Sequence, residues 1–125
     1  QMCIRDRAWI QRVAAQYDKR CGDIAYIFCD DEKILEVNRE YLSHDYYTDV
    51  ITFDYTEKNR ISGDIFISLD TVRSNAEQFG VAYDDELHRI IIHGVLHLCG
   101  IDDKGPGERE RMTEHENRAL QLLNE

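Results

Sequence analysis

The chain has 125 residues, of which 42% are hydrophobic and one is proline, and its formal net charge is −10. This length suits one domain with a substantial core and is too short for two. No apolar run is long enough for a membrane span and no signal peptide is visible, so we expect a cytoplasmic protein. Binding of nucleic acid would need a local basic patch, because phosphate contacts rely on lysine and arginine.

The four cysteines are scattered along the chain without a Cys-x-x-Cys pair, at Cys3, Cys21, Cys29 and Cys99. This spacing excludes a zinc knuckle and a dithiol redox motif. We expect all four to be reduced, with Cys29 and Cys99 buried as small apolar side chains.

The first half of the chain alternates helical and extended patterns. Residues 1–7 fit no cap or strand pattern, and we interpret them as a non-native leader of a single domain over 1–125. Apolar residues at helical spacing predict an amphipathic helix over 8–19 that packs on a sheet. A strand is expected over 24–29, and Asp30 or Asp31 is expected to begin a second helix that reaches about Leu42.

A polar loop over 43–48 leads to two strands, 50–55 and 63–69, with a turn over 57–62 between them. In the second strand, alternation places Ile65, Ile67 and Leu69 on one face of the sheet and Asp64, Phe66 and Ser68 on the other. The predicted N-cap of the following helix, 71–79, is Asp70, and Gly80 ends this helix.

Asp84 is the predicted N-cap of a helix that reaches Leu98 and is apolar nearly all round, which indicates a central, buried position. A break at 105–107 precedes a polar last helix, 108–123, whose inward residues are Met112, Leu120 and Leu123. The pattern predicts an α+β fold, a single αβα domain with a small mixed sheet and a buried central helix that carries two histidines.

These histidines, His93 and His97, are four residues apart and therefore lie on one face of the helix. Gly100 tolerates a left-handed conformation, so the chain can turn back and bring Asp103 to the same place. His93, His97 and Asp103 are ordinary zinc ligands, and three protein ligands leave a fourth position for water, as in catalytic sites. We therefore predict one zinc ion per chain; the alternative is that the histidines only pack in the core.

Several other polar residues have a functional and a structural interpretation. Asp102 is a candidate catalytic proton shuttle or else a solvated loop carboxylate. Asp49 could orient a ligand histidine or cap a turn, and for Asp64 a turn role is favoured over catalysis. The remaining histidines, His44, His88 and His115, are interpreted as surface or supporting residues.

The motif at 93–103, together with 48–53 and 63–65, resembles the YbeY family of bacterial endoribonucleases. The resemblance implies a zinc-dependent enzyme that cleaves single-stranded RNA, matures the 3′ end of 16S ribosomal RNA, acts in ribosome quality control and has the small ribosomal subunit as partner. His93 and His97 match the first two ligands of the family. Asp103 stands where a third histidine is expected, which could favour harder ions such as manganese. Leu42 stands where the family has a phosphate-binding arginine, for which Arg39 or another cation could substitute.

Two other functions remain open at this point. The spacing is similar to the metzincin protease signature, but Gly94 occupies the position of its essential glutamate and cannot transfer a proton. A non-catalytic ribosome-associated factor could use the metal only to tie the loop at 100–107 to the helix. If the protein is a nuclease, the nucleophile is either a metal-activated water or the 2′-hydroxyl of the RNA.

Overall fold

The computed structural model describes residues 4–42, 50–101 and 106–123, which form an α+β fold as predicted. In chain order, the elements are α1 (Ile4–Ala15), β1 (Arg20–Cys29), α2 (Asp31–Val37), the π-helical turn η1 (Asn38–Leu42), β2 (Val50–Asp54), β3 (Arg60–Ser68), α3 (Leu69–Phe79), α4 (Tyr83–Leu98) and α5 (Glu108–Leu123). None of the helices in these ranges combines the length and the apolar character that crossing a bilayer requires.

The three strands form one mixed sheet in the order β1-β3-β2. β1 runs parallel to β3, and β2 runs antiparallel to it, with Ile65 of β3 opposite both Tyr26 and Thr52. A parallel pair needs a long crossover connection, and α2, η1 and β2 lie within it.

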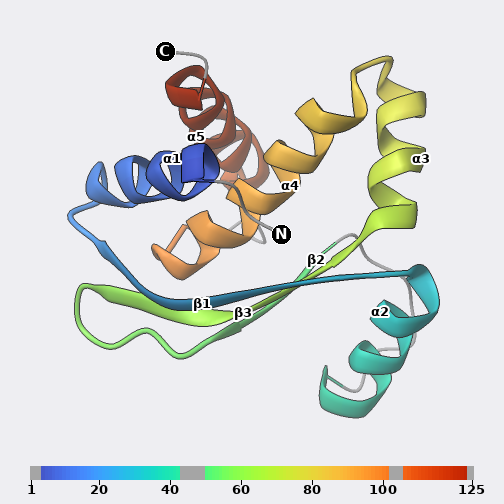
Figure 1. Ribbon diagram of the computed structural model, residues 1–125, viewed down its shortest axis with the longest axis horizontal. Coiled ribbons are helices and arrows are strands. Elements are labelled where there is room, and N and C mark those ends of the chain that lie inside the picture. The colour runs from blue at the N-terminus through green and yellow to red at the C-terminus, as the bar shows by residue number, and fades with distance from the viewer. Residues whose placement is uncertain (1–3, 43–49, 102–105, 124–125) are drawn as a thin grey trace.

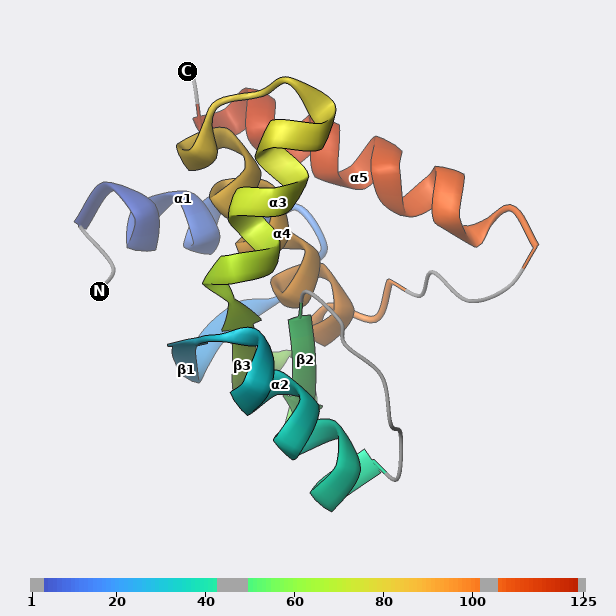
Figure 2. The same cartoon turned by 90° about the vertical axis from the view of Figure 1, so that its right-hand side faces the viewer.

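The sheet separates two layers of helices (Figure 1). On one face, the alternate residues Ile61, Ile65 and Ile67 join the main core with α1, α3, α4 and α5. On the other face α2 packs, through Ile34 and Val37, in a smaller cluster. Figure 2 shows the same arrangement from the side, with α2 and the other helices at opposite ends of the view.

The helix that carries the two histidines lies very close to the sheet. Residues of α4 such as Ile92, Val95 and Leu96 are completely buried, as the apolar pattern predicts. A Cβ atom at Gly94 would lie 2.9 Å from Cγ2 of Ile65, and one at Gly63 would lie 3.0 Å from Cδ2 of Leu98. Both glycines therefore allow the close approach of α4 and β3.

Several predicted boundaries are wrong. The first helix spans Ile4–Ala15 instead of 8–19, so residues 4–7 belong to it, and β1 begins at Arg20 instead of 24. β3 begins at Arg60 instead of 63, because Arg60 and Ile61 already pair with Arg20 and Cys21 of β1. Pairing between β1 and β3 extends these two strands beyond their apolar runs.

Two predicted helix caps are also wrong. The N-cap of α3 is Ser68, whose Oγ accepts from the backbone N–H of Thr71, so Leu69 belongs to the helix and Asp70 to its first turn. The N-cap of α4 is Ala82, which makes no side-chain cap bond, and Asp84 follows within the first turn. Acidic side chains there still interact favourably with the helix dipole. Asp30 as N-cap and Gly80 as left-handed C-cap are confirmed.

α1 binds the end of α5 in addition to packing on the core. The indole Nε1–H of Trp9 donates to the carbonyl oxygen of Ala119 at 2.7 Å, and Trp9 is fully buried. The guanidinium groups of Arg5 and Arg12 donate to the carbonyl oxygens of Leu123 and Leu122. These carbonyls belong to the last turn of a helix, where intrahelical partners are lacking. α1 thus fixes the position of α5.

Candidate metal centre

His93 and His97 face each other on α4. Their Nε2 atoms are 3.0 Å apart, and the two rings are nearly perpendicular, with centroids 4.6 Å apart. The His93 side chain is 18% exposed, so the pair lies at the edge of the core and can be reached from solvent. The i, i+4 spacing thus brings the two nitrogens together as predicted.

The backbone leaves the helix directly after this pair. Gly100 has a φ of 96°, and its N–H bonds to the carbonyl oxygen of His97, while the N–H of Ile101 bonds to that of Leu96. This is a Schellman motif, in which glycine takes the left-handed position. The prediction that the helix ends at a left-handed Gly100 is confirmed, and the predicted return of the chain to the histidines falls on residues outside the described ranges.

Asp102 and Asp103 lie outside the described residues, as do His44 and Asp49. The third ligand and the proton shuttle therefore stay predictions. Within the described ranges, no group of three or more histidine, cysteine or acidic side chains is arranged to hold a metal ion. A site built on His93 and His97 needs a donor from elsewhere, and Asp103 is the predicted one.

A carboxylate that the sequence motifs do not indicate contacts the histidine pair. Glu116 of α5 is 3% exposed, and its Oε2 lies 2.6 Å from Nδ1 of His93. The signal for it is its spacing, because Glu116 lies midway between Met112 and Leu120 on the inward stripe of α5. A charged residue on an apolar stripe is rarely buried without a partner.

The other oxygen of Glu116 is also bound. Its Oε1 accepts from Nη1 of Arg89 at 3.1 Å, and the same guanidinium donates through Nε and Nη2 to the two oxygens of Glu86. The hydrogen bonds with Glu86 raise the pKa of Arg89 above its ordinary value; burial acts against them, and the charge of Glu116 adds to the increase. Glu86 is buried and paired, rather than simply facing the helix dipole as its position suggests.

These contacts suit zinc binding by the histidine pair. An ionised carboxylate only accepts hydrogen bonds, so a neutral His93 beside it donates through Nδ1 and keeps its lone pair on Nε2. Two histidine nitrogens bound tetrahedrally to one zinc ion are about 3.3 Å apart, given Zn–N bonds of about 2.0–2.1 Å. The observed 3.0 Å differs by a few tenths of an ångström, which a small ring rotation supplies.

The other described candidates are engaged away from the pair. His88 contacts Asp6 and the backbone oxygen of Asp84, and Nδ1 of His115 lies 2.6 Å from Oη of Tyr17. Burial, followed by the charge of Arg118, lowers the pKa of His115. These contacts agree with the supporting roles predicted for both histidines.

The structure also describes Asp64 and the two cysteines that were expected to be buried. Asp64 of β3 accepts from the hydroxyl of Tyr55 at 3.4 Å. Cys99 is buried as expected, whereas Cys29 is only partly buried, and both are free thiols.

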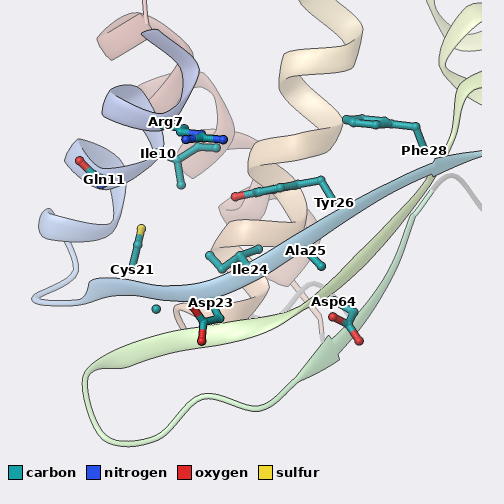
Figure 3. Close-up of a pocket in the computed structure, with 11 residues that line it drawn as sticks. Arg7, Ile10, Gln11, Cys21, Asp23, Ile24, Ala25, Tyr26, Phe28 and Asp64 are labelled. Carbon is teal, nitrogen blue, oxygen red and sulfur yellow. The ribbon is translucent and has the colours of Figure 1, made fainter. Parts of the chain in front are cut away.

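A hollow of about 1000 Å³ lies between α1 and β1 (Figure 3). Its lining comes from Arg7, Ile10 and Gln11 of α1, from much of β1 and from Asp64. Neither histidine of the pair lines it, so this hollow and the candidate metal centre are separate features.

Comparison with known proteins identifies the family. The family model described as endoribonuclease YbeY matches residues 4–124, nearly all of the chain. The chain belongs to the YbeY family. The resemblance predicted from the motif is thereby confirmed.

YbeY proteins from several bacteria are close relatives. An endoribonuclease YbeY of Bacteroides thetaiotaomicron is 75% identical over 114 residues, which cover 91% of this chain and 83% of that protein. One from Porphyromonas gingivalis is 55% identical, over 94% of this chain and 78% of its own length. The solution structure of a Thermotoga maritima protein matches with a TM-score of 0.65 and 26% identity, over 94% of this chain and 78% of that one.

Two of the stretches that carry the YbeY resemblance meet in the fold. The histidine motif contributes Gly94 and Leu98, and the stretch at 63–65 contributes Gly63 and Ile65, which are the residues at the close contact between α4 and β3. Arg39 is the suggested substitute for the family's arginine. It is exposed on η1, which continues α2 on the face of the sheet away from α4.

Proposed function

We propose that the protein is a zinc-dependent endoribonuclease that cleaves single-stranded RNA in the cytoplasm. Its proposed substrate is the 3′ end of small-subunit ribosomal RNA, during maturation and quality control, and its proposed partner is the small ribosomal subunit. Membership of the YbeY family supports the reaction class. The observation that carries the metal dependence is the pair of facing Nε2 atoms, 3.0 Å apart, with Nδ1 of His93 bound to a buried carboxylate.

In this proposal His93, His97 and Asp103 hold the zinc ion. When bound, zinc supplies a Lewis acid for a phosphate oxygen and lowers the pKa of water toward about 7. Nε2 of each histidine would provide a lone pair, and the contact of Nδ1 with Glu116 holds the ring of His93 in place. The proposed role of Asp102 is to carry a proton at its carboxylate during cleavage.

Peptidase chemistry has no support at this site. The metzincin mechanism requires a glutamate directly after the first histidine as general base. Here Gly94 faces the sheet, and any side chain added there would meet Ile65 at 2.9 Å. A proton-transfer group could therefore occupy that position only if the buried Ile65 or α4 moved.

The proposal is tested by cleavage of single-stranded RNA and of the same sequence as a duplex. We expect the wild type to cleave only the single strand, and His97→Ala to lose more than the roughly 10–100-fold that removal of a supporting group costs. The matched control is His88→Ala, which removes a histidine of the same helix that contacts Asp6 instead of the pair.

Metal content, read together with RNA cleavage and ribosome binding, distinguishes the proposal from a non-catalytic ribosome factor. We expect about one zinc per chain in the wild type, lost in both His97→Ala and Asp103→Ala, because three ligands define a catalytic site. Stoichiometric zinc together with ribosome binding but no RNA cleavage would instead indicate a structural metal. Zinc that survives Asp103→Ala would remove this carboxylate from the site.

A further inference from the structure

Glu116 is a charged group in a place that favours apolar ones. Its carboxylate is 3% exposed and lies between α5 and α4, beside core residues such as Met112. Burial of an ionised carboxylate is strongly unfavourable unless it is paired and hydrogen-bonded. An apolar residue at this position would avoid this cost, so packing alone does not explain the presence of a glutamate.

Both oxygens of Glu116 accept hydrogen bonds, and one of the donors is fixed by further hydrogen bonds. Oε2 accepts from His93 and Oε1 from Arg89. Arg89 is fixed in turn by Glu86, which is 3% exposed and also accepts from Nδ2 of Asn75 on α3. A continuous hydrogen-bonded chain thus runs across three helices, from Asn75 through Glu86, Arg89 and Glu116 to His93.

The charges along this chain do not cancel. Glu86 and Glu116 are two carboxylates and Arg89 is a single guanidinium, so with a neutral His93 ring one negative charge remains in a mostly buried cluster. A cation bound at Nε2 of His93 would balance that charge through the imidazole ring. Carboxylates that accept from the second nitrogen of a ligand histidine raise the basicity of the ring and fix its orientation.

We propose that Glu116 is the positioning residue of the metal centre. Its carboxylate directs Nδ1–H of His93 toward α5 and Nε2 toward His97, and Arg89, anchored by Glu86, keeps the carboxylate in that orientation. This inference rests on the proposed function to the extent that it takes His93 and His97 as metal ligands.

The test is the affinity of the purified protein for zinc alone, measured by competition with a chromogenic chelator. Glu116→Gln keeps the size of the side chain but removes its charge, and we expect zinc to bind about 10–100-fold more weakly. The control is Glu114→Gln, an exposed glutamate of the same helix, which should bind zinc as the wild type does. A folded Glu116→Gln protein with wild-type zinc affinity would overturn the proposal.

A second readout needs no bound metal. Long-range proton–nitrogen NMR of the metal-free wild type reports which ring nitrogen of His93 carries the proton, with His93→Ala used for assignment. We expect the proton on Nδ1; a neutral ring protonated on Nε2 would overturn the positioning role. If the wild type instead binds no zinc through His93 and His97, the proposed function fails, whatever the state of the ring.

Discussion

Tyr26 is a partly buried phenol. It lies on β1 opposite Ile65 and lines the hollow between α1 and the sheet. Burial, followed by the nearby Cys21, raises the pKa of Tyr26 above its ordinary value of 10.0. The folded protein therefore binds this proton more tightly than the unfolded chain does.

The raised pKa predicts a loss of stability in alkaline solution. The contribution of Tyr26 is fully present below pH 10.0, and it decreases at higher pH, because the unfolded chain then loses the proton first. Urea unfolding followed by circular dichroism should show a free energy of unfolding that falls more steeply above pH 10.0 in the wild type than in Tyr26→Phe.

The control for this measurement is Tyr55→Phe, which removes a phenol that is 59% exposed. Solvent screens an exposed group, so its removal should change the slope much less. Equal slopes in the wild type and Tyr26→Phe would show that the phenol of Tyr26 is as well solvated in the folded state as in the unfolded state.

The contacts of some site residues can be predicted from the sequence, and those of others cannot. The facing of His93 and His97 follows from helical spacing, and the turn at Gly100 follows from the left-handed conformation that glycine favours. Glu116 contacts His93 across 23 positions of the chain, and only the packing of α5 against α4 brings them together. Local spacing can mark Glu116 as unusual but cannot name its partner.

At the scale of elements, α4 and β2 both approach β3 closely at Gly63. A Cβ atom there would lie 2.3 Å from the carbonyl oxygen of Phe53 on β2, closer than any real contact. A backbone atom within a paired strand cannot move aside without disturbing the ladder. Gly63 is therefore required by the pairing of β2 and β3, with α4 packed above.

We expect Gly63→Ala to be destabilised by about 1–3 kcal/mol, the usual cost of overpacking. Gly22→Ala is the matched control, because an added Cβ there would meet the side-chain ends of Ser62 and Arg60, which can move. Thermal unfolding should give a clearly lower Tm for Gly63→Ala than for Gly22→Ala. Similar Tm values would mean that the strands adjust to the extra methyl group.

Elements were predictable where one local signal dominates. The bounds of α5 agree with the prediction because a glycine-proline break precedes it, and α4 was recognisable as central from its apolar surface. The sequence pattern assigns the cap of α3 to Asp70 because aspartate is a favoured N-cap residue, but Asp70 lies two residues too late in the chain, inside the first turn. Ser68 is capping residue and strand end at once, and its hydroxyl also binds Asp31 of α2, a tertiary contact.

At the scale of the whole molecule, a bound metal should stabilise the fold, because it binds the native site and not the unfolded chain. At a free zinc concentration 100 times the dissociation constant, the gain is about 2.7 kcal/mol, or roughly 10 °C in Tm for a domain of this size. Differential scanning calorimetry with zinc and with excess chelator should show this difference in the wild type.

The same experiment on His97→Ala should show no difference between zinc and chelator, since the variant lacks one ligand. A wild-type Tm that is insensitive to the chelator would argue against a metal at this site. The result is independent of RNA, so it separates metal binding from catalysis.

The pairing of α1 with α5 has a consequence for the order in which the protein is assembled. Arg5 and Leu123 are separated by 118 positions in the chain, and Trp9 and Ala119 by 110. Contacts between such distant residues close a long loop and form late in folding. During synthesis from the N-terminus, α1 can pack on β1 and α4 before α5 is made, but Trp9 and Arg5 reach their carbonyl partners, and Glu116 reaches His93, only when α5 docks. The histidine pair therefore lacks the support of Glu116 until α5 has been made and docked.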